Sequence, residues 1–287
     1  MSSPDELALR ELLRPGAVPD ASRSDKEVRP AVSLQCVTKS YGSGSTEVLA
    51  VQEASFVINA GEFVSIVGPS GCGKSTLLNI IAGLVPATSG TIKVLDRPVT
   101  GPVTQLGIVF QQHLLLPWRT ILNNVLLQIE VRHGRVSAYT ERAYALLSKV
   151  GLADFAHRFP DELSGGMNQR AAICRALIHD PDVLLMDEPF GALDAMTRDQ
   201  MALDFHRLSR AEGKTVVFVT HSIGEAVFLS NRVVVMTPRP GYVKSIIPIS
   251  LSQDRHLNIR EEPEFTRYTR QIREEFQAMG LLKGADG

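Results

Sequence analysis

Residues 68–76 read GPSGCGKST, which is Gly68, Pro69, Ser70, Gly71, Cys72, Gly73, Lys74, Ser75 and Thr76. Four residues separate the first glycine from the Gly-Lys-Ser triplet, which is the spacing of a phosphate-binding loop. The glycines allow a tight turn in which several backbone N–H groups point at one anion, and the lysine can reach the outer phosphates. The serine hydroxyl is a ligand that Mg²⁺ accepts. The stretch therefore predicts a site for a nucleotide polyphosphate and Mg²⁺.

Apolar residues on both sides place this loop between a strand and a helix. The run Phe63 to Val67 is predicted to be a buried strand. After the loop, apolar residues recur with helical spacing at Leu77, Leu78, Ile80, Ile81 and Leu84. A helix that begins here points the positive end of its dipole at bound phosphates. A glycine-rich loop can simply reverse the chain, but the full pattern in this context favours phosphate binding.

Composition and charge narrow the class of protein. The 287 residues can bury a sizeable core, and 30 basic against 31 acidic residues do not predict a nucleic-acid partner. No apolar run approaches the roughly 18 residues of a membrane-spanning helix, and residues 1–30 lack the apolar segment of a signal peptide. We therefore expect a cytoplasmic protein with a mobile N-terminal extension over residues 1–30. Three cysteines without metal-type spacing are predicted to be reduced structural thiols: Cys36, Cys72 and Cys174.

The remaining periodicity predicts an α/β fold. Strand-like runs near the N-terminus begin at Val32 and cover 48–58 and 91–95, and later ones cover 107–110, 183–186, 215–220 and 232–236. The last three runs consist largely of β-branched or apolar residues, which suits a sheet that is covered on both faces. Residues 166–178 are a helix candidate that Pro181 stops, and apolar residues recur with helical spacing at 143–150 and 265–279. The last of these is amphipathic, and we expect it to pack on the chain's own core.

Two acidic residues end the strand-like run 183–186. Asp187 is predicted to lie beside the phosphate loop and hold Mg²⁺ through water, and Glu188 to orient or deprotonate the water that attacks the γ-phosphate. Acidic residues at strand ends also cap the next helix in many proteins. The presence of the phosphate loop favours the catalytic interpretation.

A second anion-binding turn is predicted at Leu163-Ser164-Gly165-Gly166. A hydroxyl and free N–H groups would lie there at the positive end of a helix. Since one phosphate cradle is already present, a second one implies that a γ-phosphate is gripped from its far side.

With these motifs the chain resembles the ATP-binding-cassette (ABC) ATPases over roughly residues 32–249. In that family the Leu-Ser-Gly-Gly motif of one subunit closes over the ATP of another. The resemblance implies that Tyr41 stacks on adenine, although it could be an ordinary strand tyrosine. It also implies that Gln111 contacts Mg²⁺ and the attacking water, and that His221 hydrogen-bonds the γ-phosphate rather than being merely solvated. Gly191-Ala192-Leu193-Asp194 matches the loop that couples the two ATP sites.

Two positions depart from the pattern of the family. Asn168 stands where a larger or basic residue is usual, and Ser222 follows the histidine where aspartate is usual. Neither is a predicted phosphate contact, but Asn168 could alter how its helix presents Ser164.

The resemblance also separates the classes within the family. Fewer than a hundred residues and no sustained heptads lie between Gly68 and Ser164, unlike in DNA-repair relatives with coiled-coil insertions. One cassette without membrane helices is similar to an importer subunit, which works with a separate integral membrane permease and, indirectly, an external solute-binding protein. The alternative is a non-transport ABC ATPase that drives a soluble complex. A P-loop kinase would leave Ser164 to Gly166 unexplained.

Three further stretches are similar to the nitrate, sulfonate and taurine importer branch: Leu116-Pro117-Trp118, Asp187 to Arg198, and Pro238-Arg239-Pro240-Gly241. Taurine- or sulfonate-type ATPases are the most similar. The single tryptophan, Trp118, either lines the groove that receives the permease or fills the helical subdomain.

Together these features predict an α/β protein with a P-loop (RecA-like) ABC ATPase core, an antiparallel β portion and an inserted helical subdomain at about 112–172. The expected division is an extension over 1–30, the ATPase domain over 31–250 and a C-terminal helical segment over 251–287. Two copies are expected to bind two ATP, with Lys74 and Ser75 of one facing Ser164 and Gly166 of the other. The assembly would lie peripherally on the cytoplasmic face of the inner membrane.

Overall fold

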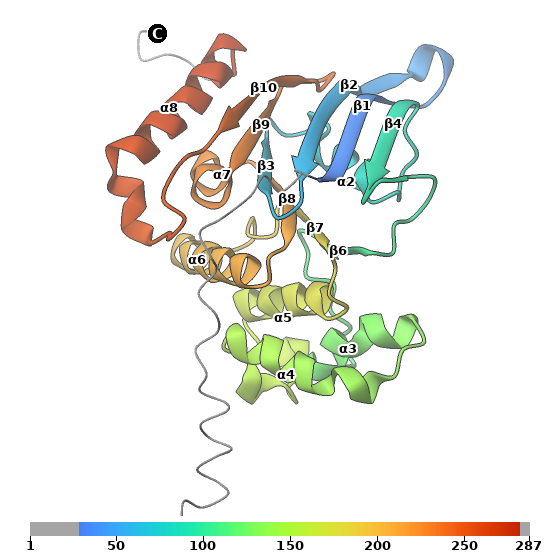
Figure 1. Cartoon of the computed structure of the whole chain (residues 1–287), viewed down its shortest axis with the longest axis vertical. Helices are drawn as coiled ribbons and strands as arrows, with labels where there is room; N and C mark the ends of the chain where they lie inside the picture. Colours follow the sequence, from blue (N-terminus) through green and yellow to red (C-terminus); the bar gives the residue numbers. More distant parts are fainter. Residues whose placement is uncertain (1–28, 282–287) are drawn as a thin grey trace, which may run out of the picture.

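The computed structural model describes residues 29–281, which form a central sheet, an antiparallel sheet and several groups of helices (Figure 1). Residues 1–28 of the predicted extension lie outside the described residues, and Pro30 already begins the first strand. The strands are β1 Pro30–Tyr41, β2 Val48–Asn59, β3 Phe63–Val67, β4 Ser89–Val94, β5 Arg97–Pro98, β6 Leu106–Val109, β7 Val183–Asp187, β8 Thr215–Thr220, β9 Arg232–Met236 and β10 Val243–Pro248.

The helices alternate with the later strands. The α-helices are α2 Lys74–Ile81, α3 Ile121–Val131, α4 Thr140–Lys149, α5 Gly165–Leu177, α6 Ala195–Ala211, α7 Ile223–Leu229 and α8 Pro263–Ala278. Short 3₁₀ helices are η1 Gly44–Thr46, η2 Val136–Tyr139, η3 Ala153–Phe155, η4 Pro160–Glu162 and η5 Leu257–Glu261. The 3₁₀ helices, the helices α3, α6 and α7, and the strands β5 and β10 were not predicted individually.

The central sheet has the order β10-β9-β3-β8-β7-β6. Its strands run parallel except β10, which pairs antiparallel with β9. The bounds predicted for β3, β8 and β9 are confirmed. The predicted α/β fold class is therefore confirmed, and the antiparallel portion is present as a second sheet of order β2-β1-β4-β5.

Alternate residues of the central strands belong to two separate cores. On β3, Phe63 and Val67 pack with the helices α3 to α8, whereas Val64 and Ile66 pack with α2 and the antiparallel sheet. Strand β8 shows the same alternation. Because both faces are buried, these strands are mostly apolar and lack a polar side that faces solvent; even Ser65 of β3 is buried. This burial explains why the sequence shows continuous runs there.

The helices α3, α4 and α5 form the helical subdomain, which lies below the central sheet in Figure 1. Buried Asn124 of α3 organises the preceding loop: its Nδ2 donates to the carbonyl oxygens of Leu116, Arg119 and Thr120, and its Oδ1 accepts from the N–H of Leu116. This loop carries Trp118, which is 71 % exposed. Trp118 therefore does not fill the helical subdomain. Residue 172, the predicted end of the subdomain, lies inside α5.

The C-terminal helix agrees with its prediction, whereas the helix after the phosphate loop is shorter than predicted. The amphipathic face of α8 is buried against the core through Phe265, Tyr268, Ile272 and Phe276, as predicted. The stripe predicted for α2 is wrong at its end, because the helix stops at Ile81 and Leu84 is exposed. Gly83 takes a left-handed conformation with φ of 71° and ends the helix, and Leu84 N–H bonds back to Asn79 O. Among residues 29–281, no helix combines the length and the apolar character needed to span a bilayer.

Candidate functional site

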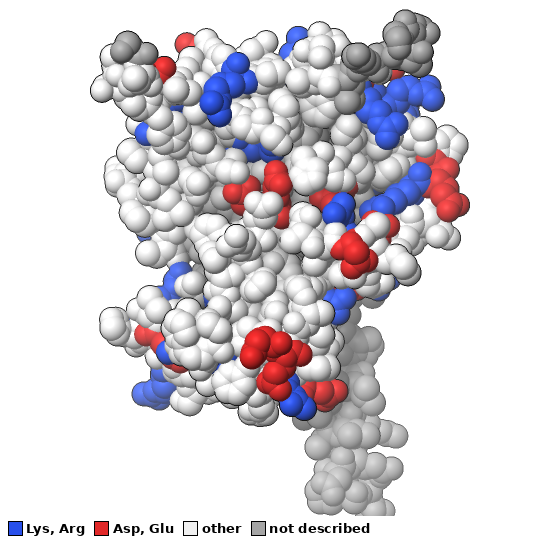
Figure 2. All heavy atoms as spheres, turned by 180° about the vertical axis from the view of Figure 1, so that it is seen from behind, with Lys and Arg blue, Asp and Glu red and all other residues white. Residues whose placement is uncertain are grey.

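The predicted site residues gather at one edge of the central sheet. The phosphate loop follows β3, Asp187 ends β7 and His221 follows β8, and these three strands are adjacent and parallel. Their carboxyl ends therefore meet at the same edge, where open α/β sheets bind ligands. Figure 2 shows the molecule from behind the view of Figure 1, with acidic and basic side chains mixed over that face.

The phosphate loop borders a hollow of about 350 Å³. The residues that line it are Tyr41, Val48, Ala50, Ser70, Gly71, Gly73, Lys74, Ser75, Thr76, Glu188 and Arg239. Gly73 has φ of 103°, and a Cβ there would lie 2.6 Å from Ala50 O, so only glycine fits this turn. Tyr41 is 42 % exposed, with Lys39 Nζ 4.9 Å from the centre of its ring. An aromatic face and a phosphate-binding turn thus share one hollow.

Lys74 lies inside the loop rather than on its surface. The side chain is buried, and Nζ donates to Gly68 O at 3.0 Å and Pro69 O at 3.1 Å. Gly68 is buried and Pro69 half-buried, which leaves Ser70 and Gly71 as the exposed tip of the turn. Since Lys74 also begins α2, its ammonium and the positive end of the helix dipole act on the same point.

Ser75 and Asp187 fit a hard cation such as Mg²⁺. The Ser75 hydroxyl donates to Asp187 Oδ1 at 2.9 Å, so a hydroxyl and a carboxylate converge on one spot beside the loop. Burial raises the pKa of Asp187 above its ordinary value, Glu188 adds to the rise, and the hydrogen bond from Ser75 opposes it. Because burial and a neighbouring negative charge disfavour the ionised form of Asp187, a cation bound beside it would stabilise that form.

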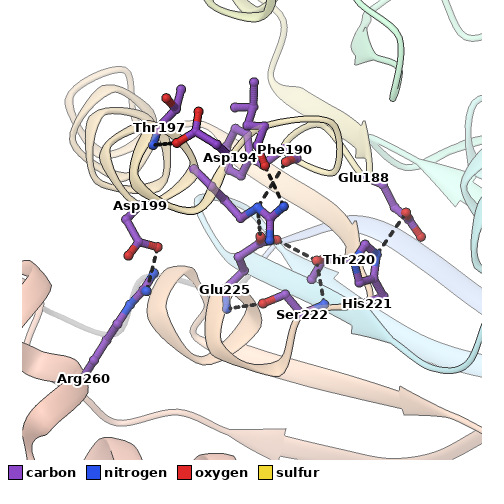
Figure 3. Close-up of polar contacts among 12 residues, drawn as sticks. Glu188, Phe190, Asp194, Thr197, Asp199, Thr220, His221, Ser222, Glu225 and Arg260 are labelled. Carbon is purple, nitrogen blue, oxygen red and sulfur yellow. Dashed lines mark hydrogen bonds and ion pairs between the residues drawn. The ribbon is translucent and has the colours of Figure 1, made fainter. Parts of the chain in front are cut away.

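Glu188 and His221 face each other beyond the strand ends (Figure 3). His221 Nδ1 lies 3.1 Å from Glu188 Oε2. The backbone of Glu188 has φ of 45°, a costly conformation for a non-glycine residue, and its N–H donates to Val219 O at 2.9 Å. The exposed Gln111 is near: its Nε2 and Glu188 Oε2 lie 3.6 and 3.8 Å from the place that a Cβ on Gly191 would take. The structure therefore brings these three predicted residues together.

The second predicted anion-binding turn begins α5. Ser164 is the N-cap, and its hydroxyl accepts from Met167 N–H at 3.3 Å. Asn168 is buried and its Nδ2 donates to Pro160 O at 2.8 Å and Leu163 O at 3.4 Å, so it fixes the chain just before Ser164. Within the described part of the chain, none of Ser164, Gly165 and Gly166 lines the hollow of the phosphate loop. The second turn is therefore formed, but it lies apart from the hollow of the phosphate loop.

The turn at α5 packs against the start of α6. A Cβ on Gly166 would lie 2.8 Å from Thr197 Cγ2, which explains its glycine. Asp194 is the N-cap of α6, and its Oδ1 accepts from Thr197 N–H at 3.1 Å. Hydrogen bonds from Thr197 lower the pKa of Asp194. Asp194 therefore lies beside the Ser164 turn and has a structural task in capping.

Sequence reasoning missed a buried network that holds the loops of the site. Glu225 is buried, and burial raises its pKa. It accepts from the Thr220 hydroxyl at 2.6 Å, and Arg198 lies 3.6 Å from its other oxygen (Figure 3). Arg198 also donates to Leu193 O, next to Asp194. The network joins the start of α6 to the turn that carries His221. The one sequence signal for it is the spacing of Ser222, the N-cap of α7, and Glu225 three residues later.

Comparison with known proteins agrees with this geometry. Residues 51–191 match the family model described as ABC transporter. A putative ATP-binding protein of Brucella abortus is 47 % identical over 238 residues, which are 83 % of this chain and 90 % of the relative. A taurine import ATP-binding protein of Jannaschia is 42 % identical over 81 % of this chain and 87 % of the relative. An aliphatic sulfonates import ATP-binding protein of Bacillus licheniformis is 38 % identical over 90 % and 98 %.

A solved structure is similar over the same region. The dimeric structure of a bacterial ABC transporter cassette matches with a TM-score of 0.67 and 36 % identity over 77 % of this chain and 100 % of that one. A second dimeric structure, of a post-hydrolysis state bound to ADP and Pi, matches with a TM-score of 0.66 and 34 % identity.

Proposed function

Because the chain belongs to the ABC transporter family and is an ATP-binding cassette ATPase, we propose that it is the ATP-hydrolysing subunit of an importer. The solute would be a small anion or a sulfonate of the taurine kind, carried by a separate integral membrane permease. The observation that carries this proposal is the match to sulfonate and taurine import ATP-binding proteins along nearly their whole length, 98 % and 87 %. The protein would then act peripherally on the cytoplasmic face of the membrane.

The site supports hydrolysis of ATP with an assigned role for each residue. The adenine ring would stack on Tyr41, and the N–H groups of Gly71 to Thr76, with Lys74, would bind the phosphates. Glu188 would accept a proton from the attacking water, since it lies beside His221 and close to Gln111. His221 would donate to the γ-phosphate. The strained backbone of Glu188 supports a catalytic task, because such strain is found mostly at functional sites.

Mg²⁺ would be held by Ser75 and Asp187, with Gln111 near them, and would supply neutralisation of the phosphate charge. The pKa of Asp187 is raised by burial, as expected for a carboxylate whose charge is neutralised only when a cation binds.

We propose that two copies complete two ATP sites. Ser164 and Gly165 are exposed, and among residues 29–281 a Cβ on Gly165 would meet nothing within 4 Å, so the packing of this part of the chain does not require glycine there. A second copy that brings its phosphate loop and ATP against this turn would require it. Both similar solved structures are dimeric, which supports the pairing of two copies.

The permease would bind the groove between the central sheet and the helical subdomain. A hollow of about 310 Å³ lies there, lined by residues of β6, α3 and α5 that include Ile108, Leu127 and Val131. Phe110, which precedes Gln111, also lines it. A permease helix in this groove would therefore touch the segment that carries a catalytic glutamine, which links transport to hydrolysis. An external solute-binding protein would take part only through the permease.

Growth tests the whole proposal. A strain that lacks this gene should fail to grow on taurine or another sulfonate as sole sulfur source, and still grow on sulfate. The wild-type gene should restore growth and Glu188→Gln should not, although the purified variant should still bind ATP. Turnover by that variant should fall roughly a hundredfold to ten-thousandfold, because it removes the general base. ATPase activity that persists in Glu188→Gln would contradict Glu188 as the base.

The partner decides between the two candidate functions. Co-purification of the full chain with an integral membrane permease supports import. Co-purification with a soluble complex alone, together with normal growth of the deletion strain on each sulfonate and on nitrate, would instead favour a non-transport ABC ATPase.

A further inference from the structure

Residues 237–242 connect β9 to β10, and Gly241 within them contacts both strand β2 and the phosphate loop, which border the nucleotide hollow. Gly241 N–H donates to Ala50 O at 3.1 Å, and Gln52 N–H donates to Gly241 O at 2.8 Å. A Cβ on Gly241 would lie 1.8 Å from the carbonyl oxygen of Cys72. Glycine at this position therefore lets the segment run directly between strand β2 and the phosphate loop.

Arg239 is the side chain that this segment presents to the hollow. Its Nε and Nη2 donate to Gly71 O at 3.2 and 3.1 Å, and it lines the hollow together with Tyr41 and Lys74. It is exposed, and no ion pair among residues 29–281 includes it. A guanidinium without an acidic partner thus stands at the rim of a phosphate-binding loop.

The two cations of the hollow are placed differently. The Lys74 ammonium is buried inside the turn, between the carbonyls of Gly68 and Pro69. Arg239 approaches the turn from outside, at its exposed tip. Its donors share one neutral carbonyl, whereas a guanidinium bonds more strongly, and often through two parallel bonds, to a phosphate. A nucleotide phosphate would therefore compete successfully with Gly71 O for these donors.

We propose that Arg239 is a second cationic contact to the phosphates of the bound nucleotide, donating to a phosphate oxygen from the outer side of the loop. This rests on the proposed function only in that the nucleotide occupies the hollow beside Lys74. Because the same segment is bonded to β2, the contact also ties the antiparallel sheet, which carries Tyr41, to the phosphates. One residue would then link recognition of the base to recognition of the polyphosphate.

Calorimetric binding of ADP and of adenosine to the full chain separates a phosphate contact from other roles. Arg239→Gln should weaken ADP binding about tenfold or more, the loss expected for a charge-assisted hydrogen bond, and leave adenosine binding unchanged. Arg239→Lys should weaken ADP binding less, because it keeps the charge and loses only the planar fork. Arg270→Gln, at an exposed arginine of α8, is the matched control and should change neither.

Three results would overturn the proposal. Equal weakening of ADP and adenosine would place Arg239 at the base or ribose, and unchanged ADP binding would leave it without a ligand contact. A lower melting temperature of Arg239→Gln without nucleotide, matching the loss in affinity, would make it a structural tie to Gly71. Lys74→Ala separates the failure of this proposal from the failure of the proposed function. If Lys74→Ala keeps its ADP affinity, the assignment of the nucleotide site fails. If Lys74→Ala loses ADP affinity and Arg239→Gln keeps it, only the Arg239 proposal fails.

Discussion

The phosphate loop and the Ser164 turn have similar sequences and opposite surroundings. Both place glycines and a hydroxyl residue at the start of a helix. In the phosphate loop the chain's own contacts demand glycine, since a Cβ on Gly73 would lie 2.6 Å from Ala50 O. At Gly165 a Cβ would meet nothing within 4 Å in the part of the chain that the structure describes. Contacts within this chain explain the glycine of the first turn. Among the described residues, no contact explains Gly165 in the second turn.

This difference concerns which chain completes the site. Lys74 is bonded into its own loop and reaches the hollow, while Ser164 and Gly165 are exposed and lie away from it. Gly166 is the exception within the turn, because Thr197 of α6 packs against it. Two variants that damage the two turns separately can therefore show whether the turns act within one chain or between two.

The largest expected effect comes from mixing two inactive variants. Lys74→Ala and Ser164→Arg should each lower ATPase turnover at least about a hundredfold, because each removes an electrostatic contact to the phosphates. In a symmetric dimer, every mixed pair has one site in which both turns are wild type. An equal mixture should therefore regain about a quarter of the wild-type activity.

The controls for this mixture are simple. Asp161→Arg places the same side chain at an exposed position shortly before the turn, with a change of two charges instead of one, and should remain active. If the mixture is no more active than either variant alone, the two turns act within one chain. Unmixed Ser164→Arg should still bind ATP, since its own phosphate loop is intact.

How far the sequence predicts this site depends on the range of the interactions. The phosphate loop, Asp187, Glu188 and Ser164 were found because short-range patterns specify them: a loop between strand and helix, or carboxylates after an apolar run. The network of Arg198, Thr220 and Glu225 was not found, because it joins two segments through burial rather than through spacing. Arg239 was noted only as part of a resemblance, since nothing local indicates that its segment crosses to Gly71.

The helical subdomain illustrates the same limit. Its extent was predicted at about 112–172. Apolar spacing indicated α4, and α5 was predicted as a helix candidate that Pro181 stops, but α3 was not predicted individually. Its first turn depends on buried Asn124, whose four hydrogen bonds to the loop 116–120 are tertiary contacts that a polar residue in the sequence does not indicate.

A smaller effect sharpens the comparison of the glycines. Gly165→Ala should leave the fold as stable as the wild type, or more stable by up to about 1 kcal/mol, because alanine is the better helix former and finds open space. ATPase activity should nevertheless fall severalfold if a second copy approaches this turn. Gly73→Ala should lower both stability and ATP affinity, since φ of 103° and Ala50 O leave no room. Thermal unfolding and steady-state ATPase assays measure the two quantities.

The opposite pattern would contradict this account of Gly165. If Gly165→Ala keeps full ATPase activity, nothing approaches the turn closely, and the exposed glycine has no task in the dimer. If Gly165→Ala lowers the stability of the fold instead, the added methyl group meets neighbouring atoms, and the space around Gly165 is not open.

The smallest effect on ATPase activity is expected at the link between the helical subdomain and the central sheet, where the expected change is in folding stability. His179 follows α5, and its Nε2 lies 3.2 Å from the carbonyl oxygen of Leu106, the first residue of β6. Burial, helped by the positive charge of Arg132, lowers the pKa of His179 to about 4, and the contact with Leu106 opposes this shift. As pH falls below about 6.5, the unfolded chain takes up a proton that the folded chain refuses. Stability should thus fall between about pH 6.5 and 4.

Urea unfolding of His179→Gln at a series of pH values isolates this proton. Relative to the variant, the wild type should lose at most about 1.4 kcal/mol for each pH unit in this window, which is the limit for one proton. His256→Gln, at an exposed histidine, should follow the wild type. Because the contact joins the helix of the Ser164 turn to the sheet of the phosphate loop, its loss should loosen one turn relative to the other. Parallel curves for wild type and His179→Gln would mean that His179 does not titrate with this link, and that packing of α5 on β6 alone fixes the distance between the two turns.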